Sequence, residues 1–221
     1  MKTLRISVSI FFAAILLLSS RVYGQKKDDF DVLTPQKGLN AKEKAAELTK
    51  EGWKTNLYSI EEQLASTWKL MCEMRENGND RRYFWAQSES SASNFSDAME
   101  KNHISCTQDL TYQVELPFLS QCRLIACKKK FSEEQIATIE KVVLHITPMV
   151  VSNHSRPSFE IFNQKDKKLV MVKSIYVVDT TGIYDIILKE CIKFLGDNEK
   201  NAPLIDVFQE AIKRMENKKL R

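Results

Sequence analysis

The chain has 221 residues, with 33 basic and 29 acidic side chains and a formal net charge of +4. This length suits one domain or a domain and a half. Residues 1–24 hold three basic residues and no acidic ones, so the remainder carries 30 basic against 29 acidic groups, a net charge of +1. Nucleic-acid binders usually show a strong basic excess or stripe. The composition therefore argues against nucleic acid as a partner.

The N-terminus has the pattern of a secretory signal peptide. Met1–Arg5 is basic, and Val8–Leu18 is a nearly unbroken apolar run of about 11 residues, the length of a signal h-region. A membrane-spanning helix needs about 20 apolar residues, so we expect no stable span after cleavage. Val22 and Gly24 suit cleavage after Gly24, and no cysteine lies nearby to carry a lipid. We expect a signal peptide over 1–24 and an exported protein, periplasmic or associated with the outer membrane and not lipid-anchored.

A single domain is expected to follow a polar tail. Residues 25–39 are polar and predict a flexible segment ahead of one domain over 40–221. Asn40 is a typical capping residue and predicts a helix start. Gly52 predicts the end of that helix. Trp53–Tyr58 then forms a candidate short strand.

The predicted centre of the fold is a strand, a turn and a long helix. Ser59 opens a helix with a second capping signal, and apolar residues at helical spacing continue it to the turn cluster Glu76–Asp80. Arg82–Gln87 is rich in aromatic residues and predicts a strand. Ser88–Asn94 consists of small polar residues and predicts a turn, and a helical pattern begins at Phe95.

The helices of the middle third follow from apolar spacing and prolines. The pattern that starts at Phe95 has one polar residue on its apolar stripe, Asn102, and should break or kink at Pro117. Ser132 begins a third capping box. The helix that it opens should finish at Pro148.

The C-terminal third predicts a β-hairpin and two further helices. Ser158–Asn163 alternates in the manner of a strand, and Leu169–Val178 is rich in β-branched residues. The helices should begin near Ile183 and Pro203. Together the elements predict an α+β fold, with a small, mostly antiparallel sheet of about four strands and helices packed on one face.

Catalytic and metal-binding patterns are few. The string Asp179-Thr180-Thr181-Gly182 is similar to the aspartic-protease signature, but an extra threonine precedes the glycine and no second copy exists. We interpret it as a strand end with a helix N-cap. The histidines have no ligand partner at helical spacing, and six glycines form no phosphate loop, so we expect no metal, no cofactor and no enzymatic activity. The histidines are His103, His145 and His154.

Five cysteines remain after the leader, and the odd number leaves at least one thiol unpaired within the chain. Cys106 and Cys191 fall on apolar helix faces and suggest buried thiols. A disulfide from Cys122 or Cys127 stays open. The fifth cysteine is Cys72.

One small-ligand hypothesis concerns the predicted strand and turn. An aromatic ring beside hydroxyl and amide groups at a helix N-terminus can hold a glycan or an anion, although aromatic residues at such spacing usually form a core and such a run usually caps the helix. The candidate binding residues are Trp85, Ser88, Ser90, Ser91 and Asn94.

Five segments carry a resemblance to a known family. They are Ala41–Trp53, Ile60–Ser66, Ala86–Ala98, Phe159–Phe162 and Val172–Val178. They resemble the first two helices, the strand–loop–helix unit and the closing hairpin of a family of uncharacterised exported envelope proteins of Gram-negative bacteria. More remotely, the strand–loop–helix unit resembles a domain of small outer-membrane lipoproteins and flagellar assembly proteins. The resemblance implies an exported module without enzymatic activity.

These observations lead to one expectation about function and two alternatives. We expect a binding or structural module that works through contacts with an envelope protein partner. The alternatives are a small-ligand or glycan carrier, and an enzyme whose active site cannot be recognised from the sequence.

Overall fold

The computed structural model describes residues 33–35, 40–76, 78, 80–166, 168–196 and 199–217. The chain divides into two units, Met1–Gln36 and Lys37–Arg221, and every helix and strand named below belongs to the second. The predicted signal peptide over 1–24 lies outside the described residues. The same is true of the predicted tail over 25–39, apart from residues 33–35.

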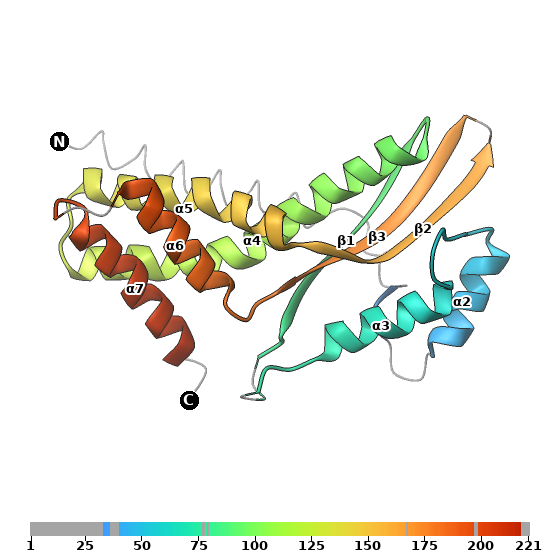
Figure 1. Cartoon of the computed structure of the whole chain (residues 1–221), viewed down its shortest axis with the longest axis horizontal. Helices are drawn as coiled ribbons and strands as arrows, with labels where there is room; N and C mark the ends of the chain where they lie inside the picture. Colours follow the sequence, from blue (N-terminus) through green and yellow to red (C-terminus); the bar gives the residue numbers. More distant parts are fainter. Residues whose placement is uncertain are drawn as a thin grey trace, which may run out of the picture. The chain divides into compact units, whose positions relative to one another are not determined.

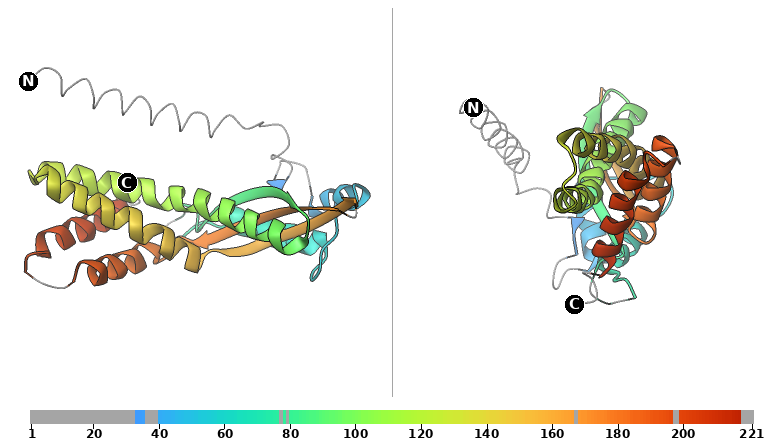
Figure 2. Two further views of the ribbon diagram at one scale, coloured as in Figure 1. Left: turned by 90° about the horizontal axis from the view of Figure 1, so that it is seen from above. Right: turned by 90° about the vertical axis from the view of Figure 1, so that its left-hand side faces the viewer.

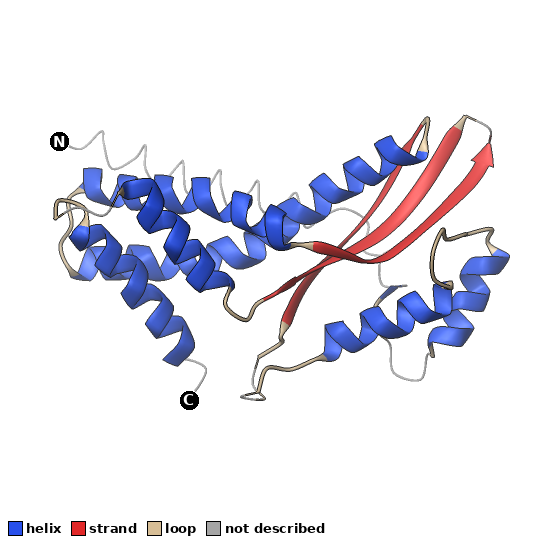
Figure 3. Ribbon diagram, in the orientation of Figure 1, coloured by secondary structure: helices blue, strands red, loops and turns tan. Residues whose placement is uncertain are grey.

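The second unit is an α+β fold, as the sequence predicts, with the strands gathered in one sheet (Figure 1; Figure 3). Its elements are α2 (Ala41–Lys50), α3 (Ile60–Cys72), β1 (Tyr83–Ala92), α4 (Phe95–Lys128), α5 (Glu133–His154), β2 (Arg156–Asp166), β3 (Leu169–Asp179), α6 (Ile183–Leu195) and α7 (Ala202–Asn217). The predicted caps are confirmed: the side chains of Asn40, Ser59 and Ser132 each accept a hydrogen bond from the third backbone amide of their helix.

Among the described residues the sheet has three antiparallel strands in the order β1-β3-β2, which confirms the predicted hairpin of β2 and β3. The prediction of about four strands is wrong. Trp53–Tyr58 contributes only an isolated bridge, in which Lys54 exchanges backbone hydrogen bonds of 2.8 and 2.9 Å with Phe162 of β2. This bridge does not extend into a strand pair because side chains of α3 form hydrogen bonds with the neighbouring backbone groups of β2.

The first strand is longer than its sequence suggests. Ser88–Ala92 belongs to β1 and pairs in register with Val170–Ser174 of β3, so the predicted turn over Ser88–Asn94 is wrong for its first five residues. Ser88 is buried on the face that α4 covers. The pairing with β3 decides the conformation of these small polar residues, whose own preferences favour a turn.

Helices pack on both faces of the sheet, not on one face as predicted. On one face α4 lies across β1 and β3 and contacts Ser174. On the other face, Ile175 and Val177 of β3 and Phe159 and Ile161 of β2 are almost fully buried, and α3 packs against β2 and β1 there. In Figure 1 the strands lie between α4 and α3.

The polar residue on the apolar stripe of α4 has a structural role. Asn102 is fully buried, and its Nδ2 donates to the carbonyl oxygen of Val172 at 2.9 Å and to Oγ of Ser174 at 3.1 Å. Both partners belong to the central strand. A buried amide with two hydrogen bonds fixes the position of α4 along that strand.

Beyond the sheet, α4 continues into a group of helices with α5, α6 and α7 (Figure 1; Figure 2). Phe118 lies at the centre of this group, and its ring centroid is 5.9 Å from that of Tyr184 and 6.1 Å from that of Phe208. The main hydrophobic core runs from the sheet into these helices and is built mainly from apolar residues of α4, α5, α6 and α7.

Two prolines lie inside helices that the sequence predicts to break or end there. Pro117 is within α4, which runs unbroken from Phe95 to Lys128, and Pro148 is within α5, which continues to His154. Packing of α4 against β1, β3, α5 and α7 supports the helix where its local preference is poor. Because proline has no N–H, the carbonyl groups of Gln113 and Leu144 lack their usual helical donor.

Candidate functional site

The ligand-binding residues predicted from the sequence do not converge. Trp85, Ser88, Ser90 and Ser91 all belong to β1, where successive side chains point to opposite faces of the sheet. Ser88 and Ser90 share the α4 face, while Trp85 and Ser91 lie on the other face, and Asn94 follows the strand as the N-cap of α4. None of the five lines either of the two grooves described below.

Three of these residues use their polar atoms inside the fold. Oγ of Ser90 donates to the carbonyl oxygen of Ala98 at 2.6 Å. Oδ1 of Asn94 accepts from the amide of Asp97, and its Nδ2 donates to the Asp97 carboxylate, each at 2.9 Å. The carbonyl oxygen of Ser91 accepts from Nζ of Lys101. These contacts join β1 to the first turns of α4.

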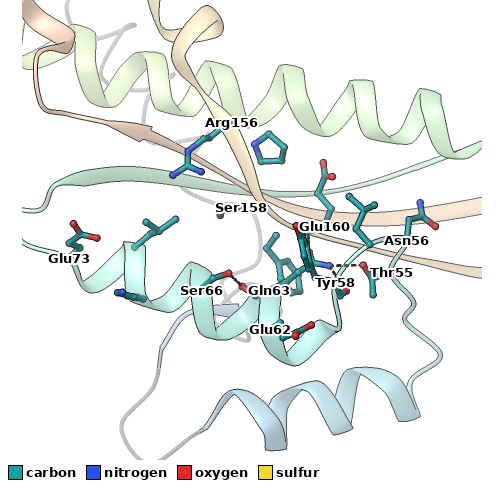
Figure 4. A pocket seen from close by; sticks show the side chains of 15 residues that line it. Thr55, Asn56, Tyr58, Glu62, Gln63, Ser66, Glu73, Arg156, Ser158 and Glu160 are labelled. Carbon is teal, nitrogen blue, oxygen red and sulfur yellow. Dashed lines mark hydrogen bonds between the residues drawn. The ribbon is translucent and has the colours of Figure 1, made fainter.

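A first groove, the edge groove, lies between α3 and β2 and has a volume of about 680 Å³ (Figure 4). Its floor is β2 from Arg156 to Glu160, and its rim includes the exposed side chains of Leu57 and Tyr58. The lining is mixed, with apolar surface beside the charged groups of Glu62, Lys69, Glu73, Arg156 and Glu160.

Side chains of α3 cap the outer edge of β2 along this groove. Oε1 of Gln63 accepts from the amide of Glu160 at 2.8 Å, and Nε2 of the same residue donates to Oγ1 of Thr55 (Figure 4). Oγ1 of Thr67 donates to the carbonyl oxygen of Ser158 at 2.8 Å. Exposed strand edges can pair with further strands. These contacts prevent such pairing along the part of β2 that they cover.

A second groove, the helical groove, runs between α4 and α5 and has a volume of about 480 Å³. The two helices lie side by side in Figures 1 and 2. Large apolar side chains along it are exposed: Ile104 at 51%, Tyr112 at 57% and Leu144 at 49%. The lining residues are His103, Ile104, Thr107, Gln108, Thr111, Tyr112, Glu115, Leu144, Pro148 and Ser152.

The helical groove also contains polar groups without partners. The Glu115 side chain is buried, yet within the described residues it has no hydrogen bond and no ion pair, and burial raises the pKa of its carboxyl group. Oγ1 of Thr107 is buried without a hydrogen bond. Pro148 has no N–H to give to the carbonyl group of Leu144. Apolar surface and unmet hydrogen-bonding groups therefore occur in one groove.

The sequence offered one signal for this groove. Ile104 and Tyr112, eight residues apart on α4, lie on a different stripe from the buried Cys106, Leu110 and Val114. Two apolar stripes on one helix indicate that it has more than one packing partner.

The protease-like string forms an ion pair and a turn. Oδ2 of Asp179 lies 3.2 Å from the Arg82 guanidinium, and Oδ1 accepts from the amide of Thr181 at 2.8 Å. Partial burial opposes ionisation, but the Thr181 and Arg82 contacts prevail and lower the pKa of Asp179. The predicted N-cap is wrong in detail, since Gly182, with φ of 75°, occupies the cap of α6 and Asp179 only closes the preceding turn.

The cysteines are all free thiols in the structure, and burial keeps three of them protonated. Burial raises the pKa of Cys106 and of Cys191 to about 12, and the pKa of Cys122 rises for the same reason. Nucleophilic attack needs the thiolate. Cys72 and Cys127 are exposed.

The histidines take part in ring contacts, or end a helix. His103 packs against Tyr176 with centroids 5.3 Å apart, and His145 packs against Phe194 at 5.0 Å. His154 is the last residue of α5, beyond the helix end that the sequence predicts at Pro148. Within the described part of the chain no three His, Cys, Asp or Glu side chains gather as metal ligands.

Comparison with protein-family models, with curated proteins and with solved structures gives no match for this chain. None of the helices in the described residues combines the length and apolar character that crossing a membrane requires.

Proposed function

We propose that this protein is an exported, non-enzymatic binding module, and that the helical groove is where it contacts a protein partner. The observation that carries the proposal is the exposed apolar surface of that groove, where Ile104, Tyr112 and Leu144 stand about half exposed over a cavity of about 480 Å³. Contiguous exposed apolar surface on a folded chain commonly marks an interaction site.

The placement of the titratable groups supports a contact function over bond-making chemistry. Asp179 pairs with a cation, and Cys106, Cys122 and Cys191 are buried thiols. Catalytic groups need to converge on an accessible point at hydrogen-bond distance.

Export rests on the amino-acid sequence of the leader. The basic start and the apolar run over Val8–Leu18 favour cleavage after Gly24 and delivery to the periplasm or the outer membrane of a Gram-negative envelope. N-terminal sequencing of the protein recovered from an envelope fraction is expected to begin at Gln25. Recovery with Met1 intact from the cytoplasmic fraction would contradict export.

Site-specific photo-cross-linking in the producing cells tests the groove. A photoreactive amino acid at Ile104 or Tyr112 is expected to give a cross-linked product with one protein partner. The matched control is Leu124, which belongs to the same helix and is 45% exposed but lies outside the groove. Equal products from positions 104 and 124, or none from position 104, would overturn the proposal.

A second candidate function, a small-ligand or glycan carrier, is favoured by the edge groove. Its volume of about 680 Å³ falls in the range of about 300–1,000 Å³ found for ligand pockets. The exposed ring of Tyr58 and the guanidinium of Arg156 would contact such a ligand. Thermal-shift screening against oligosaccharides tests it: a shift lost in both Tyr58→Ala and Arg156→Ala supports the carrier, and no shift contradicts it.

A further inference from the structure

The helical groove holds a buried carboxylate that the described residues leave without a cation. Glu115 is 6% exposed and lines the groove, and neither a hydrogen bond nor an ion pair reaches its side chain within the described residues. Elsewhere among the helices, Glu140 pairs with Arg123, and Glu210 pairs with Lys129 and Arg214. A buried charge is stable when it is paired, so Glu115 is suited to a cation from outside the fold.

Two further groups of the groove accept hydrogen bonds without a matching donor. Within the described part of the chain, Oγ1 of Thr107 is buried and has no hydrogen-bond partner. The carbonyl group of Leu144 precedes Pro148 by one helical turn, and Pro148 has no N–H. Both groups can accept a hydrogen bond, and the Glu115 carboxylate lines the same groove. Lysine and arginine side chains carry donors only, so a basic side chain is complementary to Glu115.

The dimensions of the groove suit a helix. On α4 the lining residues run from His103 to Glu115, which at about 1.5 Å per residue is about 18 Å. On α5 they run from Leu144 to Ser152, about 12 Å. A partner helix of about 12 residues covers this length, and its apolar side chains would contact Ile104 and Tyr112.

We propose that the occupant of the helical groove is an amphipathic helix of a protein partner whose apolar stripe carries one lysine or arginine, and that this cation pairs with Glu115. The inference rests on the proposed function of the groove and adds the chemistry of the partner. Helices that present an apolar face to a hydrophobic groove form a recurring mode of peptide recognition. Here the single cation sets the register of the helix, because only one carboxylate of the groove is buried and unpaired.

A pair of synthetic peptides tests the inference with the full chain. Both have an amphipathic sequence of about 16 residues, long enough to form a helix on binding. They differ only at one central position of the apolar stripe, which is Lys in one peptide and Met in the other. Fluorescence anisotropy measures the Kd of each. The Lys peptide is expected to bind about tenfold more tightly than the Met peptide.

Glu115→Gln is expected to remove this preference, so that the Lys peptide and the Met peptide bind the variant with the same Kd. Glu100→Gln is the matched control, because Glu100 lies on the exposed side of α4 and outside the groove. Circular dichroism and urea unfolding verify that Glu115→Gln keeps the fold. If fold and binding are kept and the two peptides bind wild type equally, the pairing with Glu115 is wrong and the groove function stands.

Two other outcomes would contradict the amphipathic helix as the occupant of the groove. Binding of neither peptide, together with absence of the cross-link from position 104, rejects both the helix and the proposed function. A concentration-dependent dimer in sedimentation velocity that Tyr112→Asp abolishes identifies a second copy of this chain as the occupant, which contradicts the partner proposed above.

Discussion

The edge groove and the helical groove differ in whether their buried polar groups have hydrogen-bond partners. In the edge groove, Gln63 and Thr67 of α3 satisfy the outer backbone groups of Glu160 and Ser158. In the helical groove, the largely buried residue Glu115 has no hydrogen bond or ion pair within the described residues, and Oγ1 of Thr107 is buried without a partner there. Both grooves lie beside a helix, so shape alone does not distinguish them.

This difference separates a structural contact from a binding surface. Leaving a buried polar group unsatisfied destabilises the folded state by about 1–3 kcal/mol. Described residues outside the helical groove also carry such atoms, Oδ1 of Asn102 and Oδ2 of Asp80, so the distinguishing feature of this groove is an unpaired carboxylate beside exposed apolar side chains. The edge groove protects a strand edge against pairing with other chains. The helical groove retains exposed apolar side chains and unmet acceptors, which suits a surface that is completed by another molecule.

The largest expected effect on stability is at Thr67. Thr67→Val keeps the shape of a fully buried side chain but removes the hydrogen bond of 2.8 Å to the carbonyl oxygen of Ser158. We expect the free energy of unfolding to fall by about 1–3 kcal/mol, measured by urea denaturation. An unchanged value would show that the contact with the β2 edge does not stabilise the fold.

The same exchange on α5 is expected to act in the opposite direction. Thr147 is fully buried on α5, and its Oγ1 has no hydrogen-bond partner within the described residues. Thr147→Val replaces an unsatisfied hydroxyl by a methyl group, so the free energy of unfolding should rise by about 1 kcal/mol. A loss of stability equal to that of Thr67→Val would show that Oγ1 of Thr147 makes a stabilising contact.

The features that sequence predicts well here are local ones. The capping boxes at Ser59 and Ser132, the β2–β3 hairpin and the helix start at Ile183 each depend on residues within a few positions of one another. The residue types themselves favour these structures.

The features that sequence misses depend on partners far along the chain. Ser88–Ala92 extends β1 because β3 lies beside it, and α4 and α5 pass through Pro117 and Pro148 because neighbouring helices support them. The candidate site was missed for the same reason. Leu110 and Tyr112 are both large apolar residues of α4, and only the packing of α5 and the sheet decides that the first is buried and the second exposed.

A smaller effect, spread over a pH range, is expected at Glu115. Burial raises the pKa of its carboxyl group in the folded state above the ordinary value, so the folded state binds more protons than the unfolded state between the two values. Below the ordinary pKa the carboxyl group is protonated in both states and does not destabilise the fold. The destabilisation grows as pH rises from the ordinary pKa through the folded-state pKa. Glu115→Gln should gain stability relative to wild type over that interval.

Urea unfolding of wild type and Glu115→Gln at about pH 4 and about pH 7 measures this change. The difference between the two proteins cancels the contributions of other titrating groups, such as Glu160, whose pKa burial also raises. Glu100→Gln is expected to show no comparable trend. A difference that is constant across pH would mean that water or a neighbouring group already stabilises the Glu115 carboxylate.

The smallest effect on stability is expected at the exposed apolar residues of the helical groove. Ile104→Asp places a charge on a side chain that is already 51% exposed, so the free energy of unfolding should change by about 0.5 kcal/mol or less, as for Leu124→Asp on the same helix. Truncating a buried residue of this size lowers stability by about 2–5 kcal/mol. A loss of that size at Ile104 alone would make the groove part of the core and remove the basis for a binding surface, because its apolar residues would then stabilise the fold. A small change, with loss of the cross-link from Tyr112, would show that these residues serve contact with another molecule.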